Sequence, residues 1–437
     1  MKKGWQTKRL GDVCEIIKGR KPALKATATN GDLPYLVAKV MRGSKEAEYA
    51  SVKDRNSITV EESETIIICD GSNSGEVFTG FRGILSSTMG KIAKKAEIDD
   101  DYLRAFLAST FDVFNGAKTG AAIPHLDKEG MYQLQFPFPP LAEQQRIVGL
   151  LDEAFEGLAT AKANAEKNLQ NARALFESGL DSAITGKLTR ERRHKHKKIG
   201  NASADLAGRL TVRRKQWTGT GKYREPDAPV TLKPIDVPDG WVLASPEQIT
   251  THIVDCPHST PKWAESGVLC LRTTNFKPGF LDLESVRFVS QQTYKERIMR
   301  LEPQPGDVLF SREGGILGIA CMIPEKLKTC LGQRMMLFRA DATLVLPEYF
   351  TAVLNSTLII SEVKRLTGGA ASPHLNICDI RTFPIPLPPI TEQRQIVAKL
   401  NTIAAETQNL ARLYERKLAA LAELKKSLLH QAFTGEL

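Results

Sequence analysis

The sequence of 437 residues has few of the features that mark a metalloprotein, a secreted protein or a membrane protein. Its seven cysteines are scattered and show no Cys-x-x-Cys spacing, which argues against a zinc knuckle or a redox dithiol. The odd number of cysteines without a framework indicates reduced thiols in a reducing compartment. The longest apolar stretch, residues 349–360, is too short and too polar to span a bilayer, and Met1 to Trp5 lack a secretory core. We therefore expect a soluble, cytoplasmic protein.

Catalytic motifs are also missing. Residues 138–141 and 387–390 resemble the Asn-Pro-Pro-Tyr loop of amino-methyltransferases, but neither copy has the Asn or Asp that holds the target amine. Residues 218–222 resemble a P-loop without its upstream glycine, and Tyr223 replaces the magnesium-binding Ser or Thr. A set that could bind metal on paper, His252, Cys256 and His258, fits no zinc spacing. We expect no catalytic residue, no metal site and no cofactor in this chain.

The composition that remains is that of a globular protein. Apolar residues make up 42% and charged residues 25%, and the length allows two or three domains with sizeable cores. The net charge of +10 suits a polyanionic partner but does not prove one.

The chain is built on a long internal repeat. Pro139-Pro140-Leu141-Ala142-Glu143-Gln144 corresponds to Pro388-Pro389-Ile390-Thr391-Glu392-Gln393 at an offset of 249 residues (139 to 388). The same offset joins Pro124-His125-Leu126 to Pro373-His374-Leu375, and Thr185-Gly186-Lys187-Leu188 to Thr434-Gly435-Glu436-Leu437. A gapless repeat with so long a period indicates a duplicated domain rather than a solenoid.

Each copy predicts one long helix that starts at the paired prolines. Apolar or small residues recur at steps of three and four from Ile147 to Ala183 and from Ile396 to Ala432. Each helix of about 40 residues is roughly 60 Å long at ~1.5 Å per residue. We favour an antiparallel intramolecular coiled coil of the two helices over two helices buried separately in their own domains.

The fold class expected is mixed α/β (α+β), with two globular domains joined by the two helices. The first domain has short β-type runs, such as 13–17, 35–40 and 65–69, and a helix at 101–111. The expected segments are a first domain at 1–138, a long helix at 139–188, a basic and proline-rich connector at 189–239, a second domain at 240–387 and a second long helix at 388–437.

The connector begins with a basic run, residues 190–198, and ends with Pro226, Pro229, Pro234 and Pro238. We interpret it as an extended, solvated linker, and the alternative is a flexible arm that binds phosphates.

With no catalytic motif, binding is the remaining function. Arg, Asn and Lys side chains recur in or beside predicted loops at comparable places in both halves, and these side chains suit base edges and phosphates. The candidates for DNA contact are Lys18, Arg20, Lys21, Lys39, Arg42, Lys118, Arg272, Asn275, Lys277, Arg312, Lys364 and Arg365. An ordinary surface charge is the alternative for any single one of them.

The repeated Pro-Pro-[Leu/Ile]-x-Glu-Gln start, the long helices ending in Thr-Gly-Lys-Leu and Thr-Gly-Glu-Leu, and the two dissimilar domains resemble the specificity subunit of type I restriction–modification systems. This resemblance implies a non-catalytic subunit with two recognition domains, each reading one half of a split, asymmetric target in double-stranded DNA. It also implies a coiled-coil spacer, two docked methylation subunits and restriction (translocase) subunits. S-adenosylmethionine, ATP and Mg²⁺ would then belong to the partners. The heavy basic run of the connector departs from the pattern.

The expected docking residues lie at the two helix starts: Glu143, Gln144, Arg146, Glu392, Gln393 and Arg394. Two other functions stay open on the residues alone. A single-chain enzyme that modifies or cuts DNA would act without partners, and a coiled-coil protein that binds DNA without sequence preference would select no motif.

Overall fold

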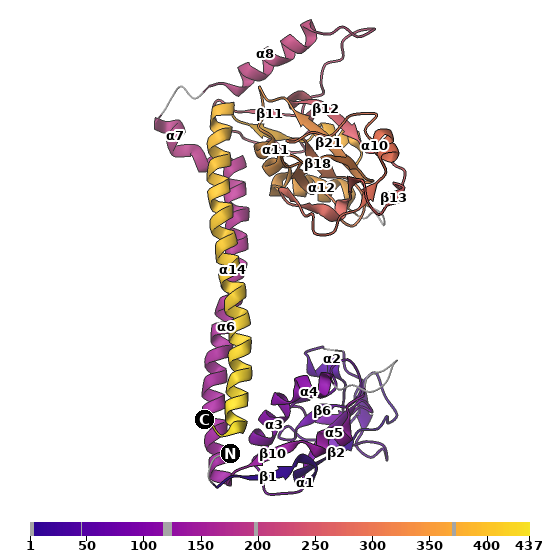
Figure 1. Ribbon diagram of the computed structural model, residues 1–437, viewed down its shortest axis with the longest axis vertical. Coiled ribbons are helices and arrows are strands. Elements are labelled where there is room, and N and C mark those ends of the chain that lie inside the picture. The colour runs from indigo at the N-terminus through magenta and orange to yellow at the C-terminus, as the bar shows by residue number, and fades with distance from the viewer. Residues whose placement is uncertain (1–3, 45, 117–124, 196–199, 369–372) are drawn as a thin grey trace. The chain divides into compact units, whose positions relative to one another are not determined.

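The computed structural model describes residues 4–44, 46–116, 125–195, 200–368 and 373–437 (Figure 1). It divides into two compact units, one formed by Met1–Lys167 with Tyr414–Leu437 and the other by Asn168–Leu413. We call them unit 1 and unit 2. Each contains an α/β domain and a portion of both long helices.

Unit 1 contains two four-stranded sheets, with strand orders β2-β9-β6-β7 and β4-β3-β8-β5, and the pair β1-β10. The strands are β1 Gln6–Arg9, β2 Cys14–Lys18, β3 Asp32–Leu36, β4 Tyr49–Ser51, β5 Thr59–Val60, β6 Ile66–Ile68, β7 Val77–Phe78, β8 Gly83–Leu85, β9 Met89–Lys94 and β10 Gln135–Phe138. The helices of this domain are α1 Leu10–Val13, α2 Ala38–Met41, α3 Asp100–Ser109, α4 Phe111–Gly116 and α5 Lys128–Gln133.

Unit 2 has the corresponding sheets β12-β21-β18-β19 and β13-β17-β14-β20, with the pairs β11-β22 and β15-β16. The strands are β11 Val242–Ala244, β12 Thr250–Asp255, β13 Trp263–Ala264, β14 Val268–Leu271, β15 Phe276–Lys277, β16 Phe280–Leu281, β17 Phe288–Val289, β18 Val308–Ser311, β19 Ala320–Met322, β20 Thr329–Leu331, β21 Met335–Ala340 and β22 Ile385–Leu387. The helices are η1 Lys187–Thr189, α7 Arg190–Lys195, α8 Ala202–Lys215, α9 Pro246–Ile249, η2 Thr273–Asn275, α10 Gln291–Arg297, α11 Pro347–Leu354, α12 Thr357–Thr367 and α13 Ile377–Arg381.

The first sheets of the two domains repeat one topology, whereas the second sheets differ in their fourth strand, because β5 pairs with β8 in unit 1 and β13 pairs with β17 in unit 2. In each, a central strand, β6 or β18, lies in the first sheet and is buried along its whole length. Such a continuous apolar run is typical of a strand covered on both faces. The second sheet of each domain contains one parallel pair, β3 with β8 and β14 with β20. The mixed α/β class predicted from the sequence is confirmed.

The long helices are α6, Leu141–Ile184, and α14, Ile390–Thr434 (Figure 1). Each is followed closely by a glycine in the left-handed region, Gly186 at φ 71° and Gly435 at φ 82°, which suits a helix C-terminus. Within unit 1, Ile147 and Leu151 near the start of α6 share a core with Leu429 and Ala432 near the end of α14.

Within unit 2 the other ends of the two helices meet. Leu180 and Ala183 near the end of α6 share a core with Ile396 and Leu400 near the start of α14. The helices are therefore antiparallel in both units. The coiled coil predicted from the apolar spacing, and its antiparallel direction predicted from the duplication, are confirmed.

Two local expectations differ from the structure. The run 35–40 was expected to be a strand, but β3 ends at Leu36 and Ala38–Met41 form α2. The connector was interpreted as extended, but it contains α8, whose Asn201 cap accepts hydrogen bonds from Ser203 N and Ala204 N. Residues 225–240 do run without helix or strand, as their prolines suggest.

Candidate nucleic-acid interface

A polar corner lies where β2 and β6 of unit 1 end. The carboxylate of Asp70 pairs with Lys18 Nζ at 2.7 Å and with His125 Nδ1 at 2.8 Å. Partial burial works to raise the pKa of Asp70, but hydrogen bonds from Lys18 and His125 outweigh it and lower that pKa below its usual value. Asp70 therefore holds two exposed, hydrogen-bond-donating side chains in fixed positions.

Unit 2 has a corner at the same place in the topology. Lys18 is the last residue of β2 and pairs with Gly90 of β9. Asp255 is the last residue of β12 and pairs with Met336 of β21, the strand that corresponds to β9. Isolated bridges join Asp70 to His125 in unit 1 and Glu313 to His374 in unit 2. His125 and His374, which the repeat relates, thus reach equivalent corners.

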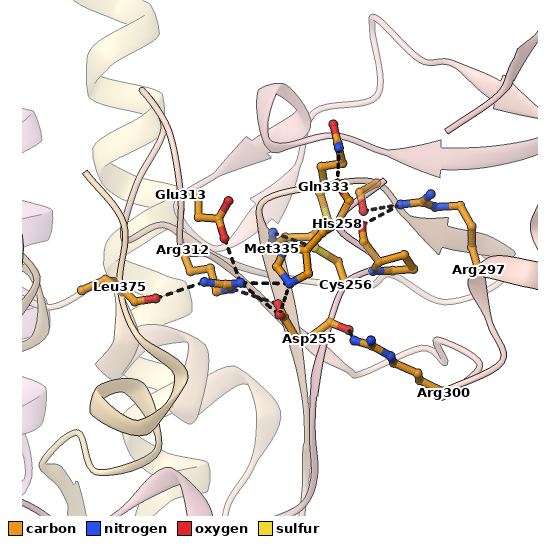
Figure 2. A network of polar contacts seen from close by, with 12 residues as sticks. Asp255, Cys256, His258, Arg297, Arg300, Arg312, Glu313, Gln333, Met335 and Leu375 are labelled. Carbon is orange, nitrogen blue, oxygen red and sulfur yellow. Dashed lines mark hydrogen bonds and ion pairs between the residues drawn. The ribbon is translucent and has the colours of Figure 1, made fainter. Parts of the chain in front are cut away.

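The charges at the second corner are arranged differently (Figure 2). Arg312 is only 6% exposed and donates to both carboxylate oxygens of Asp255 at 2.9 Å, and to Leu375 O at 3.1 Å. Burial works to lower the pKa of Arg312, but Asp255 and Glu313 outweigh it and raise that pKa. Asp255 also binds His258 Nε2 at 2.8 Å, and His258 is 58% exposed.

The loop that carries His258 is held by Arg297 and Gln333 (Figure 2). Arg297 is buried and donates to Pro257 O and Ser259 O at 3.2 Å, and to Leu331 O and Gly332 O at 2.6 Å. Gln333 Nε2 donates to His258 O at 2.5 Å. A side chain on such a loop is positioned before any partner arrives, which lowers the entropic cost of binding.

The other candidates of unit 1 lie on loops and on the short helix α2. Arg20 and Lys21 are exposed just after β2. Lys39 pairs with Glu46 at 3.7 Å, and Arg42 pairs with Glu76 and lies 5.9 Å over the Phe78 ring. Lys118 lies outside the described residues. The structure therefore brings Lys18 to the corner and gives the other candidates surface positions.

The other candidates of unit 2 differ in exposure. Asn275 is buried, because it accepts from Arg272 N at 2.9 Å and donates to Asp282 O and Ser285 O at 3.0 and 2.9 Å. It shapes the turn that presents the exposed Lys277. Arg272 is half-buried and donates to Ser285 O at 3.1 Å. Lys364 and Arg365 are exposed on α12, and Arg365 pairs with Glu362 at 2.7 Å.

The glutamines of the repeat, predicted as docking residues, are buried and hydrogen-bond to backbone groups. Gln144 Oε1 accepts from Asp99 N at 2.9 Å, and its Nε2 donates to Pro139 O at 2.8 Å. Gln393 repeats this geometry, accepting from Leu346 N at 2.8 Å and donating to Leu344 O and Pro388 O at 2.7 and 2.8 Å. Each glutamine joins the start of a long helix to the N-cap of α3 or α11.

The glutamates of the repeat differ between the units. Glu392 is buried, accepts from Thr189 Oγ1 at 2.6 Å and Trp241 Nε1 at 3.0 Å, and pairs with Arg193 of α7. Glu143 is half-buried and pairs with Arg146 at 2.7 Å. Arg146 and Arg394 are exposed. A partner can therefore reach Arg146, Arg394 and part of Glu143 directly.

Sequence reasoning missed the histidines of the corners as site residues. The Pro-His-Leu repeat was a signal for His125 and His374, because it recurs at the helix offset. His258 was considered only as a metal ligand. Among the described residues, no group of three or more His, Cys, Asp or Glu side chains is placed to hold a metal ion. No helix in the described ranges is both long enough and apolar enough to cross a membrane.

Comparison with known proteins decides the family. The family described as type I restriction modification DNA specificity domain matches residues 2–169 and 285–416, which is more than half of the chain. The chain belongs to this family. The resemblance inferred from the repeated helix starts is confirmed.

Among curated proteins, the type I restriction enzyme MjaVIII specificity subunit of Methanocaldococcus jannaschii is 24% identical over 439 residues, covering 99% of this chain and 93% of that protein. The EcoKI specificity subunit of Escherichia coli K12 is 26% identical, covering 73% of this chain and 61% of that protein.

Two solved structures share the fold. A chain from a structure describing complex assembly and conformational transition of the type I R-M system aligns with a TM-score of 0.66 at 18% identity, covering 100% of this chain and 99% of that chain. The HsdS subunit from Thermoanaerobacter tengcongensis aligns with a TM-score of 0.50 at 17% identity, covering 100% and 98%.

Proposed function

We propose that this chain is the DNA-recognition subunit of a type I restriction–modification complex and reads a target in two parts, one with each unit. The observation that carries the proposal is the pair of corners. The same backbone position holds Lys18 in one unit and Asp255 in the other. Like scaffolds with different side chains suit an asymmetric target, because base edges are distinguished by the donors and acceptors that face them.

Residues at each corner and the exposed cations near it are the proposed DNA contacts. In unit 1 these are Lys18, Arg20, Lys21, Lys39, Arg42 and His125, with Lys118 on sequence grounds. In unit 2 they are His258, Lys277, His374, Lys364 and Arg365, with Arg272, Asn275 and Arg312 as supports that position them. Cations contact phosphates and set the register of the protein on the duplex, and the fixed histidines suit base edges.

The partners proposed are two methylation subunits, one at each helix start, and restriction (translocase) subunits that join the same complex. Glu143, Arg146 and Arg394 are the proposed docking side chains, and Gln144, Glu392 and Gln393 hold the surface they lie on. The chain itself is proposed to be non-catalytic, with S-adenosylmethionine, ATP and Mg²⁺ bound by the partners. The proposed division is recognition at 1–138 and 240–387, and spacing by the helices at 139–188 and 388–437, joined by the connector 189–239.

Exchange of one recognition domain tests the proposal. Residues 1–138 are replaced by the corresponding domain of a relative, and the variant is expressed with its methylation subunit in a host whose methylome is then sequenced. One half of the target should change while the other half and the gap persist. A change in both halves would show that the units do not read independently. Methylation or cleavage by the purified chain alone would make it an enzyme instead.

The spacing role has its own test. Because α6 ends at Ile184 and Gly186 is in the left-handed region, the added turn is placed inside the helices, and four residues inserted into both α6 and α14 lengthen the spacer by ~6 Å. Because DNA advances ~3.4 Å per base pair, we expect the same two half-sequences with a gap longer by one or two base pairs. An unchanged gap at full activity would contradict the spacer role.

A further inference from the structure

The connector carries most of the excess positive charge of the chain. Residues 189–239 contain 13 Lys and Arg against 6 Asp and Glu, a net charge of +7 out of the +10 of the whole sequence. A solvated linker needs no such excess, and the cations in the described part of this segment fall into two sets.

One set of cations fastens the connector to unit 2. Arg209 and Arg213, one helical turn apart on α8, both bind the buried Asp341 at 2.7 Å. Arg213 also donates to Gln248 O at 2.9 Å. Leu206 is buried on the same face of α8. Arg193 of α7 is fastened similarly, to Glu392.

The opposite face of α8 and the turn after it stay exposed. Val212 and Lys215 are exposed on α8, and Trp217 is 49% exposed just beyond it. The indole is ordered, because it lies edge-on to Tyr223 at 5.8 Å and covers Gly219, where a Cβ would come within 2.3 Å of the ring. Lys222 is exposed beside this aromatic turn. We call Val212, Lys215, Trp217 and Lys222 the connector ridge.

The position of the ridge separates it from the corner that faces DNA. Asp341, where α8 is fastened, follows Ala340, which pairs with Thr250 at the start of β12. Asp255 lies at the other end of the same strand, about 17 Å away at ~3.3 Å per residue. The two surfaces therefore adjoin opposite ends of one sheet, and a different partner for each is the simplest arrangement.

We propose that the connector ridge docks a methylation subunit, through a surface of that subunit that sets carboxylates around an apolar pocket for the indole. This rests on the function proposed above. Duplex DNA would engage Lys215 and Lys222 but offers no pocket for Trp217 and Val212. An exposed, ordered tryptophan is typical of the centre of a protein interface, and the exposed lysines beside it suit the polar rim around that centre. The start of α8 lies beside the start of α14, because a Cβ on Gly200 would come within 3.1 Å of Pro389.

Binding of the purified methylation subunit to the full chain tests the proposal at low and high salt. Trp217→Ala should weaken binding at least tenfold at both salt concentrations. Lys215→Glu with Lys222→Glu should weaken it at least tenfold at low salt and by less at high salt, because exposed charges are screened. The matched controls, Met299→Ala at an 82% exposed site and Lys295→Glu on α10, should stay within twofold.

Unchanged affinity in both ridge variants would overturn the proposal. So would a charge variant that loses DNA binding as the isolated chain while keeping the methylation subunit, since the ridge would then be a phosphate contact. Circular dichroism confirms that each variant is folded. Methylome sequencing of the unaltered chain separates the two ideas, because a two-part target keeps the proposed function standing even if the ridge variants bind normally.

Discussion

The recognition domains of units 1 and 2 share the strand order of their first sheet but carry opposite charges at both ends of an equivalent strand pair. Lys18 ends β2 where Asp255 ends β12. At the other end, Lys95 follows β9 where Asp341 follows β21. Lys95 makes an exposed pair with Glu15 at 3.3 Å, whereas Asp341 is buried beneath two arginines. The duplicated scaffold therefore tolerates inversion of charge at its strand ends, which frees those positions to differ in function.

The shared parts are those that build the joints. Gln144 and Gln393 make matching hydrogen bonds to the N-caps of α3 and α11. Such a tie uses backbone groups, which every sequence has, so it survives while exposed side chains diverge. The comparison predicts equal costs for breaking the joints and unequal costs for breaking the corners.

The largest difference is expected at the corners. Arg312→Ala removes the side chain that binds both oxygens of the half-buried Asp255. Loss of one partner of a buried ion pair lowers the free energy of unfolding by about 3–5 kcal/mol. Lys18→Ala removes a side chain that is 40% exposed and should cost less than about 1 kcal/mol. Urea unfolding followed by near-UV circular dichroism measures both. Equal losses would mean that the corners are built with the same stability.

The joints should respond alike. Gln144→Ala and Gln393→Ala each leave buried backbone groups without partners, at about 1–3 kcal/mol per site in net cost. Gln145→Ala, at the exposed neighbouring position, is the matched control and should stay within about 0.5 kcal/mol. Hydrogen exchange should show faster opening of the amide of Asp99 in the first variant and of Leu346 in the second. If the amide of Asp99 or Leu346 stayed protected from exchange in its variant, the glutamine would not be what holds that N-cap.

The third comparison depends on pH. Burial works to raise the pKa of Asp341, but hydrogen bonds from Thr343, Arg209 and Arg213 outweigh it and lower that pKa to about 2. Because the folded pKa lies below the unfolded value of about 3.9, the carboxylate stabilises unit 2 fully above about pH 5, by about 2 kcal/mol. This stabilisation is lost as the pH falls from about 4 to 2.

Asp341→Asn should therefore be less stable than the unaltered chain at pH 7, with the difference vanishing near pH 2. Glu15→Gln at the equivalent end of unit 1 should change the free energy of unfolding at pH 7 by less than about 0.5 kcal/mol, since its pair with Lys95 is exposed. Thermal unfolding from pH 2 to pH 7 gives both curves. A difference for Asp341→Asn that does not change with pH would assign its effect to something other than charge.

The sequence predicted what local patterns encode. The repeated helix starts and apolar steps located α6 and α14, and the buried run at 65–69 located β6. Helix α8 was missed because it is held by Arg209 and Arg213, which are polar and add nothing to an apolar periodicity. Its only clear signal was the capping residue Asn201.

The candidate site was less accessible from the sequence than the fold. Arg312 was predicted as a DNA contact, but it is buried against Asp255, which lies 57 residues away and is joined to it by no local pattern. Asn275 looked like a base-reading amide, yet its hydrogen bonds are all used within the 272–285 turn. Whether a polar side chain is used within the protein or is available to a ligand depends on contacts with residues distant in the sequence. The spacing of apolar residues does not predict such contacts.

The smallest effect on stability and the sharpest on function should come from the corner histidines. His125 and His258 are 54% and 58% exposed, so replacing either by Asn should change the free energy of unfolding by less than about 1 kcal/mol. A lost or altered base contact costs about 1–3 kcal/mol at one base pair. His125→Asn should therefore relax the target at one position of one half, and His258→Asn at one position of the other half, in methylation assays on singly substituted sites. His430→Asn, an exposed histidine on α14, is the matched control and should leave both halves unchanged. If each corner variant relaxed positions in both halves, the two units would not read separate parts of the target, and the inverted corners would be a feature of stability alone.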